Sequence, residues 1–160
     1  MIVFLDSGVL GLLTNPNKKG QPLLCENWLY SLLAKGVVVV SSDVCDYEVR
    51  RSLLVETNKN RSDNSVNNLD DLRETIDFLK LETEVMLCAS QVWREARQRG
   101  RKTADDSSFD VDMIIIAHWR LLKEEHPSRY IVIATTNVKH LSEFSLSLIH
   151  ISEPTRPIAI

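Results

Sequence analysis

Several features that would have defined the class of this protein at once are scarce or missing in its sequence. It has three cysteines, Cys25, Cys45 and Cys88, an odd number without C-x-x-C spacing, which argues against a disulfide scaffold and a cysteine-based zinc site. We interpret them as free, mostly buried thiols of a reducing compartment. No apolar run is long enough to cross a membrane, and the N-terminus has no basic segment and an acid at Asp6, unlike a signal peptide. We therefore expect a cytoplasmic protein.

An excess of positive charge is also missing. The net charge is −3, which excludes a uniformly basic nucleic-acid coat but leaves room for a local basic patch. There is no internal repeat. The 160 residues suffice for one domain with a real core, and the hydrophobic content of 44% is ordinary for a globular protein.

Short apolar runs alternate with helical patterns along the chain. Such alternation predicts an α/β fold in which helices cover both faces of a mainly parallel central sheet, in three α/β/α layers. The run of β-branched residues at 37–40 has no polar alternation, as is typical of a strand covered on both faces. Strands are expected at 2–5, 37–40 and 130–134; helices are expected at 8–13, 22–34, from 43 through Leu54, from Leu69 through Leu79, 85–100 and 112–122.

Local signals set some of these boundaries. The apolar stripe of the 22–34 helix comprises Leu23, Leu24, Trp28, Leu29, Leu32 and Leu33. Gly36 follows that helix, where a C-cap glycine is common. Ser41 and Ser42 are suited to cap the next helix, whereas the polar segment 57–68 is expected to be a loop.

Polar residues recur where the expected strands end. Asp6 follows the first strand, Glu48 lies in the helix after the second, Asp112 opens a helix, and Thr135, Thr136 and Asn137 follow the last strand. Parallel topology would return all of them to one edge of the sheet, where ligands of open α/β sheets bind. Carboxylates gathered there would suit Mg²⁺ or Mn²⁺, with Asp110 as a further ligand or, alternatively, only a helix N-cap. Asp6 taken alone would be interpreted as a cap of the following turn.

Four segments, in order, resemble motifs of the PIN-domain ribonucleases, in particular the VapC-like toxin group. They read VFLDSGVL at 3–10, SDVCDYEVR at 42–50, DVDMIIIA at 110–117 and IATTNVKHL at 133–141. The resemblance covers essentially all of residues 1–145. It implies a cytoplasmic endoribonuclease that cleaves single-stranded RNA with Mg²⁺ or Mn²⁺, an antitoxin protein as partner, and a homodimer.

The same resemblance implies roles for individual residues. Asp6, Glu48 and Asp112 would be catalytic and hold the metal, and Ser7, Thr136 and Asn137 would support them from a second layer. Asn137 stands where many PIN domains have a fourth acid, and His140 where they often have an aspartate. From the residues themselves, the arginine-rich segment 93–102 and the Glu48 helix are the candidate RNA-binding surface. The residues named for it are Arg50, Arg97, Arg99, Arg101 and Lys102.

Other interpretations remain open at this stage. A catalytically weak or inactive PIN-type module would bind RNA or protein without cutting. A dehalogenase-type phosphatase is disfavoured because Gly8 stands where it needs a second Asp, and a receiver domain because Ser7 follows Asp6. By base rate, the arginine run is a solvated helix face, His118 is a satisfied core histidine, and Trp28, Trp93 and Trp119 are core residues.

The end of the chain is unusual. Residues 146–156 read LSLIHISEPTR, which resembles the in-frame translation of a common sequencing adapter. We therefore expect a PIN-like domain over 1–145 followed by a non-native tail over 146–160. The alternative is a natural final strand at 146–151.

Overall fold

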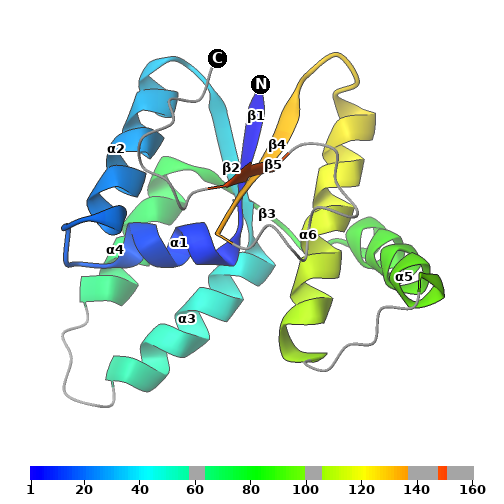
Figure 1. The fold of residues 1–160 in the computed structure, drawn as a ribbon, viewed down its shortest axis with the longest axis horizontal. Coiled ribbons are helices and arrows are strands. Elements are labelled where there is room, and N and C mark those ends of the chain that lie inside the picture. Colours follow the sequence, from blue (N-terminus) through cyan, green and yellow to red (C-terminus); the bar gives the residue numbers. More distant parts are fainter. Residues whose placement is uncertain (58–63, 100–105, 137–147, 151–160) are drawn as a thin grey trace.

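The computed structural model describes residues 1–57, 64–99, 106–136 and 148–150, of which 57, 106–109 and 148–150 are described by their backbone alone. Its centre is a five-stranded sheet in which every neighbouring pair is parallel, in the order β3-β2-β1-β4-β5. Figure 1 shows α1, α2 and α4 on one side of this sheet and α5 and α6 on the other. The expected three-layer parallel α/β fold is therefore confirmed. The strands are β1 (Ile2–Leu5), β2 (Val38–Ser42), β3 (Asp77–Leu79), β4 (Ile131–Thr135) and β5 (Leu148–His150).

The three central strands form the middle of the core because their side chains are apolar on both faces. Every residue of β1 and of β4 is buried, and Val39 and Val40 of β2 are buried as well. Full burial of such a side chain contributes about 1.5–3 kcal/mol, so these strands dominate the hydrophobic stabilisation. Phe4 lies opposite Val40 on one neighbouring strand and opposite Ile133 on the other.

Helix boundaries differ from the expected ones at three places. The segment 57–68 is not a loop throughout, because a helix begins at Asn64. The helix expected through Leu79 ends at Thr75, and residues 77–79 form the strand β3. The helix expected from Asp112 begins six residues earlier. The helices are α1 (Ser7–Thr14), α2 (Gln21–Ala34), α3 (Asp43–Thr57), α4 (Asn64–Thr75), α5 (Thr83–Gln98) and α6 (Asp106–Glu125).

The expected caps are present. Gly36 has a φ of 73° just past the end of α2 and donates its N–H to Leu33 O, which is the left-handed glycine terminus predicted there. Ser42 Oγ accepts the Val44 N–H at 3.2 Å and so caps α3. The predicted stripe of α2 is wrong in part: Leu23 and Leu24 are exposed, and the buried face is formed by Cys25, Leu29 and Leu32.

The strand β5 lies inside the segment that resembles adapter sequence. Its backbone pairs in parallel with β4, with Leu148 opposite Ile133 and His150 opposite Thr135. This is the arrangement expected of a natural final strand at 146–151, the alternative interpretation of the tail. The boundary of the native domain near residue 145 stays a prediction.

Candidate active site

The strand order creates a switch point between β1 and β4. From β1 the chain moves outward to β2 and β3, and it then returns to place β4 on the other flank of β1. In open α/β sheets, ligands bind at the carboxyl ends of the two strands that flank such a point. Asp6 directly follows β1, Thr135 ends β4, and Thr136 follows it. The predicted convergence of the first and fourth motifs is therefore observed for these residues.

Asp6 is buried and both of its carboxylate oxygens accept hydrogen bonds. Oδ1 accepts the Val9 N–H at 2.9 Å, which caps α1, and Oδ2 accepts the Thr135 hydroxyl. Burial raises the pKa of Asp6 above its usual value; the hydrogen bonds oppose this rise, and the negative charge of Glu48 adds to it. Asp6 is thus a helix cap, as it would be if taken alone. It is also close enough to Glu48 for their charges to interact.

Glu48 extends this site into a groove. It lies on α3, is half-buried, and forms an ion pair with Arg51 at 3.8 Å. The groove has a volume of about 720 Å³ and runs between α1, α3 and the start of α4. Gly8 lines it beside Ser7, and Glu48 lines it from α3. A groove of this volume, lined by Glu48, could admit part of an extended polymer.

Asp112 lies beyond the same edge of the sheet. A contact between α6 and the carboxyl end of β2 indicates this position: His118 of α6 hydrogen-bonds through Nε2 to Ser42, the last residue of β2, at 2.8 Å. Asp112 is six residues earlier, about 9 Å along the helix axis. Figure 1 shows α6 running opposite to the strands, so its earlier residues project past their carboxyl ends. Asp112 is half-buried and Asp110 is exposed.

The three acids do not form a closed cluster. Within the described ranges, no three histidine, cysteine, aspartate or glutamate side chains lie together in an arrangement that could hold a metal ion. Asp6 and Glu48 make one electrostatically coupled pair, and Asp112 comes from the other side of the sheet edge. The metal-binding and catalytic roles of these residues, and of Asp110, stay predictions.

The supporting residues are placed in part. Ser7 Oγ is buried and has no hydrogen-bond partner among the described residues. Burial raises the pKa of the nearby Cys45 thiol to about 12, and Ser7 opposes this rise. Thr136 packs against Gly8 so closely that a Cβ at Gly8 would collide with the Thr136 hydroxyl. Asn137 and His140 lie outside the described residues. A buried hydroxyl beside Asp6 is the kind of group that orients a carboxylate.

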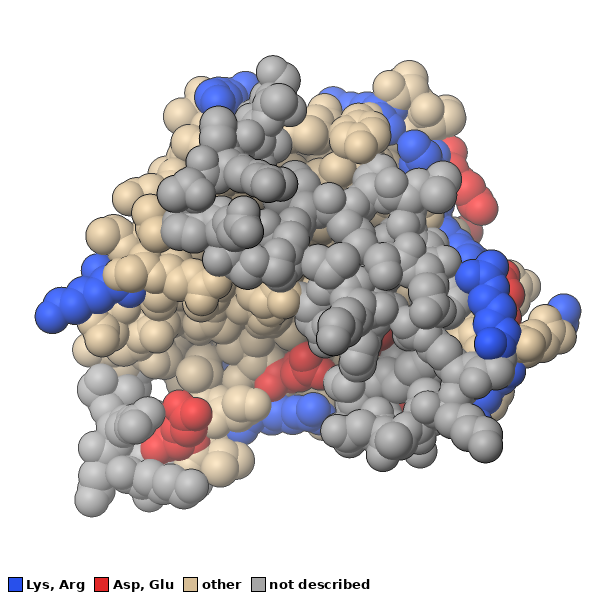
Figure 2. All heavy atoms as spheres, viewed as in Figure 1, with Lys and Arg blue, Asp and Glu red and all other residues tan. Residues whose placement is uncertain are grey.

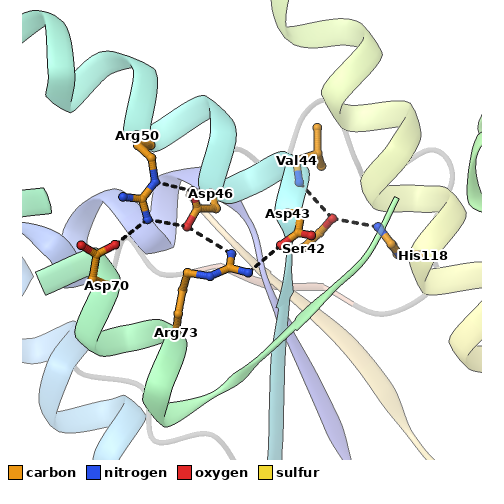
Figure 3. A network of polar contacts seen from close by, with 8 residues as sticks. All are labelled: Ser42, Asp43, Val44, Asp46, Arg50, Asp70, Arg73 and His118. Atoms are coloured by element: carbon orange, nitrogen blue, oxygen red, sulfur yellow. Dashed lines mark hydrogen bonds and ion pairs between the residues drawn. The ribbon is translucent and has the colours of Figure 1, made fainter. Parts of the chain in front are cut away.

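A network of charges that the sequence did not indicate surrounds Asp46 (Figure 3). Arg50 donates to both oxygens of Asp46, at 2.8 and 3.1 Å, and to Asp70 at 2.8 Å. Arg73 donates to Asp46 at 3.2 Å and to Asp43 at 2.9 Å. Burial alone would raise the pKa of Asp46, but the two guanidinium groups outweigh it and lower the pKa. Arg50, predicted to bind RNA, is therefore engaged in joining α3 to α4.

The arginine-rich segment is described up to Arg99. Arg97 lies over the ring of Trp93 at 4.7 Å, and Trp93 is 40% exposed, so its predicted place in the core is wrong. Trp119 is buried as predicted, and its indole N–H donates to Ile131 O. Arg101 and Lys102 lie outside the described residues. On the face drawn in Figure 2, the described Lys and Arg side chains stand at separate places, several beside Asp or Glu.

The fold is a three-layer parallel α/β architecture with Asp6 at its switch point, as expected of a PIN-like fold. No protein-family model and no curated protein matches the chain. Solved structures share its fold, at identities too low to establish more than the fold.

Three of these structures match almost the whole chain. VapBC2 from Rickettsia felis, bound to a DNA fragment of its promoter, has a TM-score of 0.66 at 17% identity, over 94% of this chain and 98% of that one. VapBC-1 from nontypeable Haemophilus influenzae has a TM-score of 0.63 at 19% identity, over 96% and 100%. FitAcB from Neisseria gonorrhoeae has a TM-score of 0.61 at 16% identity, over 93% and 97%. The PIN-like fold is thus confirmed. None of the described helices is long and apolar enough to span a membrane.

Proposed function

We propose that the protein is a Mg²⁺- or Mn²⁺-dependent endoribonuclease that cleaves single-stranded RNA. The observation that carries this proposal is the buried carboxylate of Asp6 at the switch point. This carboxylate is electrostatically coupled to Glu48, and Glu48 lines the groove. A carboxylate whose ionised form is disfavoured by burial is costly to maintain, and such groups are concentrated at functional sites.

The oxygen donors at this edge fit a hard divalent cation. Mg²⁺ is commonly bound through one or two carboxylates while it keeps several waters, so Asp6 and Glu48 would provide enough protein ligands. Asp112, entering from α6, would be a third. When bound, such an ion supplies an activated water and compensates charge that grows on a phosphodiester. The Ser7 hydroxyl and the Thr135 hydroxyl would orient the carboxylate of Asp6.

We further propose that the protein is the toxin of a toxin–antitoxin pair. Solved structures that share its fold over almost its whole length include VapBC and FitAB assemblies. Their likeness supports an antitoxin protein as a partner. We propose that this partner covers the groove and that the functional unit is a cytoplasmic homodimer. RNA would be the substrate.

Cleavage of RNA by matched variants tests the enzymatic proposal. Single-stranded RNA is incubated with the wild-type protein in Mn²⁺ and in EDTA, and with Glu48→Gln and Asp112→Asn in Mn²⁺. We expect the substitutions to lower the cleavage rate by roughly 100-fold or more. Glu74→Gln, an exposed acid on α4, is the control and should cleave like the wild type. Equal RNA loss in all arms would leave the proposal without support.

The second candidate is a PIN-type module that binds RNA or protein without cutting. Two observations favour it: both oxygens of Asp6 already accept hydrogen bonds, and the acids of the described residues form no closed three-member cluster. A binding module would retain RNA equally well in Mn²⁺ and EDTA and would leave it intact in both. Gel analysis of the bound RNA after incubation separates the two candidates.

A further inference from the structure

An exposed aromatic ring stands directly beside the candidate site. Tyr47, the neighbour of Glu48 on α3, is 60% exposed. The guanidinium of Arg51, one helical turn later, lies 5.2 Å from the centre of its ring. The same guanidinium is paired with Glu48 at 3.8 Å. The Arg51 guanidinium thus links the ring of Tyr47 to Glu48, which lines the groove.

Arg51 and Arg50 differ in how strongly acidic side chains engage their guanidinium groups. Arg50 donates three short hydrogen bonds to Asp46 and Asp70, which hold it against α4. Arg51 is 46% exposed in its side chain, and its ion pair with Glu48 is longer than a hydrogen bond. A guanidinium has five N–H donors, so Arg51 retains donors for a further anion while Glu48 and Tyr47 hold it in place.

We propose that Tyr47 and Arg51 form a platform for one nucleotide of single-stranded RNA. A base would stack on the ring of Tyr47, and a phosphate beside that base would pair with Arg51. This inference rests on the proposed function, because it assumes that RNA is the ligand. It assigns to Arg51 the phosphate contact that the sequence suggested for Arg50. The platform would hold the strand next to Glu48, where the proposed cleavage takes place.

The chemistry of both side chains supports this ligand. Bases stack on aromatic side chains regardless of their identity, and arginine adds both phosphate pairing and a cation–π contact. Leu54 and Val55, farther along α3, are also exposed. They would suit a protein partner, but they bring no charge, whereas the Tyr47–Arg51 pair provides the cation that a phosphate needs.

Binding of RNA without cleavage tests the platform. A short fluorescein-labelled single-stranded RNA of mixed sequence is titrated with the full chain in EDTA, and anisotropy gives the Kd. We expect Tyr47→Ala to raise the Kd by roughly 5- to 150-fold, and Tyr47→Phe to bind like the wild type. Tyr130→Ala is the matched control: Tyr130 is 59% exposed and precedes β4 at the opposite edge of the sheet. Arg51→Gln should reduce the slope of log Kd against log salt concentration by about one.

The outcomes separate this inference from the proposed function. If the wild type cleaves RNA in Mn²⁺ but Tyr47→Ala binds it unchanged, the platform is wrong and the nuclease stands. If Tyr47→Ala weakens binding but the wild type does not cleave RNA in Mn²⁺, the platform stands and the nuclease is wrong. If Tyr47→Ala leaves RNA binding intact but shifts the oligomeric mass in size-exclusion chromatography, the face is a protein contact instead. Circular dichroism of each variant shows that a loss of binding is not a loss of fold.

Discussion

The buried imidazole of His118 should make the stability of the fold depend on pH. His118 lies inside the core with Ser42 at 2.8 Å from its Nε2 and with Phe4 stacked on its ring at 5.8 Å between centroids. Its prediction as a satisfied core histidine is confirmed. Burial lowers its pKa to about 4, although the charge of Asp43 opposes this. The folded protein therefore holds this histidine neutral.

The direction of this pH dependence follows from the number of protons that the folded and the unfolded chain bind. An unfolded histidine has a pKa near 6.5, so between about pH 6.5 and pH 4 the unfolded chain binds more protons at this position than the folded one. Falling pH then favours unfolding within this window. With the two pKa values, the loss is about 2 kcal/mol at about pH 5 and approaches about 3 kcal/mol below pH 4. Above pH 7 the contribution vanishes.

Urea unfolding at a series of pH values measures this effect when the wild type is compared with His118→Gln. The glutamine does not titrate, and its amide can still hydrogen-bond to Ser42. Other groups that titrate on acidification, such as Asp6, whose pKa is raised by burial, are present in both proteins and cancel in the difference. We expect the free energy of unfolding of the wild type, minus that of His118→Gln, to fall by about 2 kcal/mol from about pH 8 to about pH 5. A difference that stays constant with pH would refute the reasoning.

Three further results are expected. Gly8→Ala should lower the free energy of unfolding by about 1–3 kcal/mol because its Cβ would collide with Thr136. Gly11→Ala on the same helix, where a Cβ meets no atom, should be neutral or stabilising, and equal urea midpoints of the two variants would contradict this. Arg73→Met should cost about 1 kcal/mol in urea unfolding by taking one of two cations from Asp46, and an unchanged midpoint would show that the pair contributes nothing. Mn²⁺ should raise the Tm of the wild type in a thermal-shift assay, reversibly with EDTA, because it binds the folded state; a Tm independent of Mn²⁺ would argue against a metal site.

The sequence was sufficient for the centre of the fold because that part is determined locally. Runs such as 2–5 and 131–134 are apolar on both faces, and only a covered strand or a buried helix accommodates such a run. Strand β3 was missed for a physical reason. Leu79 continues the helical spacing of Leu69, Leu72 and Ile76, and only pairing with Ser42 of β2 makes it extended. That partner lies more than thirty residues away, so no local pattern indicates it.

The same distinction holds at the site. Asp6 was found because an acid directly after a buried strand is a local pattern. Its contact with Thr135 spans 129 residues, and the contact of Arg73 with Asp46 spans 27, so neither is visible in the spacing of the motifs. Trp93 was misplaced because helical periodicity assigns a face and not the partner that covers it. The exposure of Trp93 beside Arg97 depends on how α5 rests on α6.

Asp6 decides between the two candidate functions because its structural role and its charge can be separated. Since its pKa is raised in the folded state, the unfolded chain loses this proton first, and stability is lost as pH rises from its usual value of 3.8 through the folded pKa. The ionised form of this buried carboxylate thus costs stability. Maintaining such a charge makes physical sense where the charge itself is used.

Asp6→Asn removes the charge and can keep both hydrogen bonds. Asparagine caps helices about as well as aspartate, so its Oδ1 can accept the Val9 N–H, while its Nδ2 donates to the Thr135 hydroxyl, which turns to accept. We therefore expect the variant to unfold in urea at neutral pH within about 1 kcal/mol of the wild type, or to be more stable, yet to cleave RNA roughly 100-fold more slowly or not at all. A stable variant with wild-type cleavage would remove Asp6 from the metal site. A variant that fails to fold would mean that the carboxylate is structural, since the cap alone does not account for that loss.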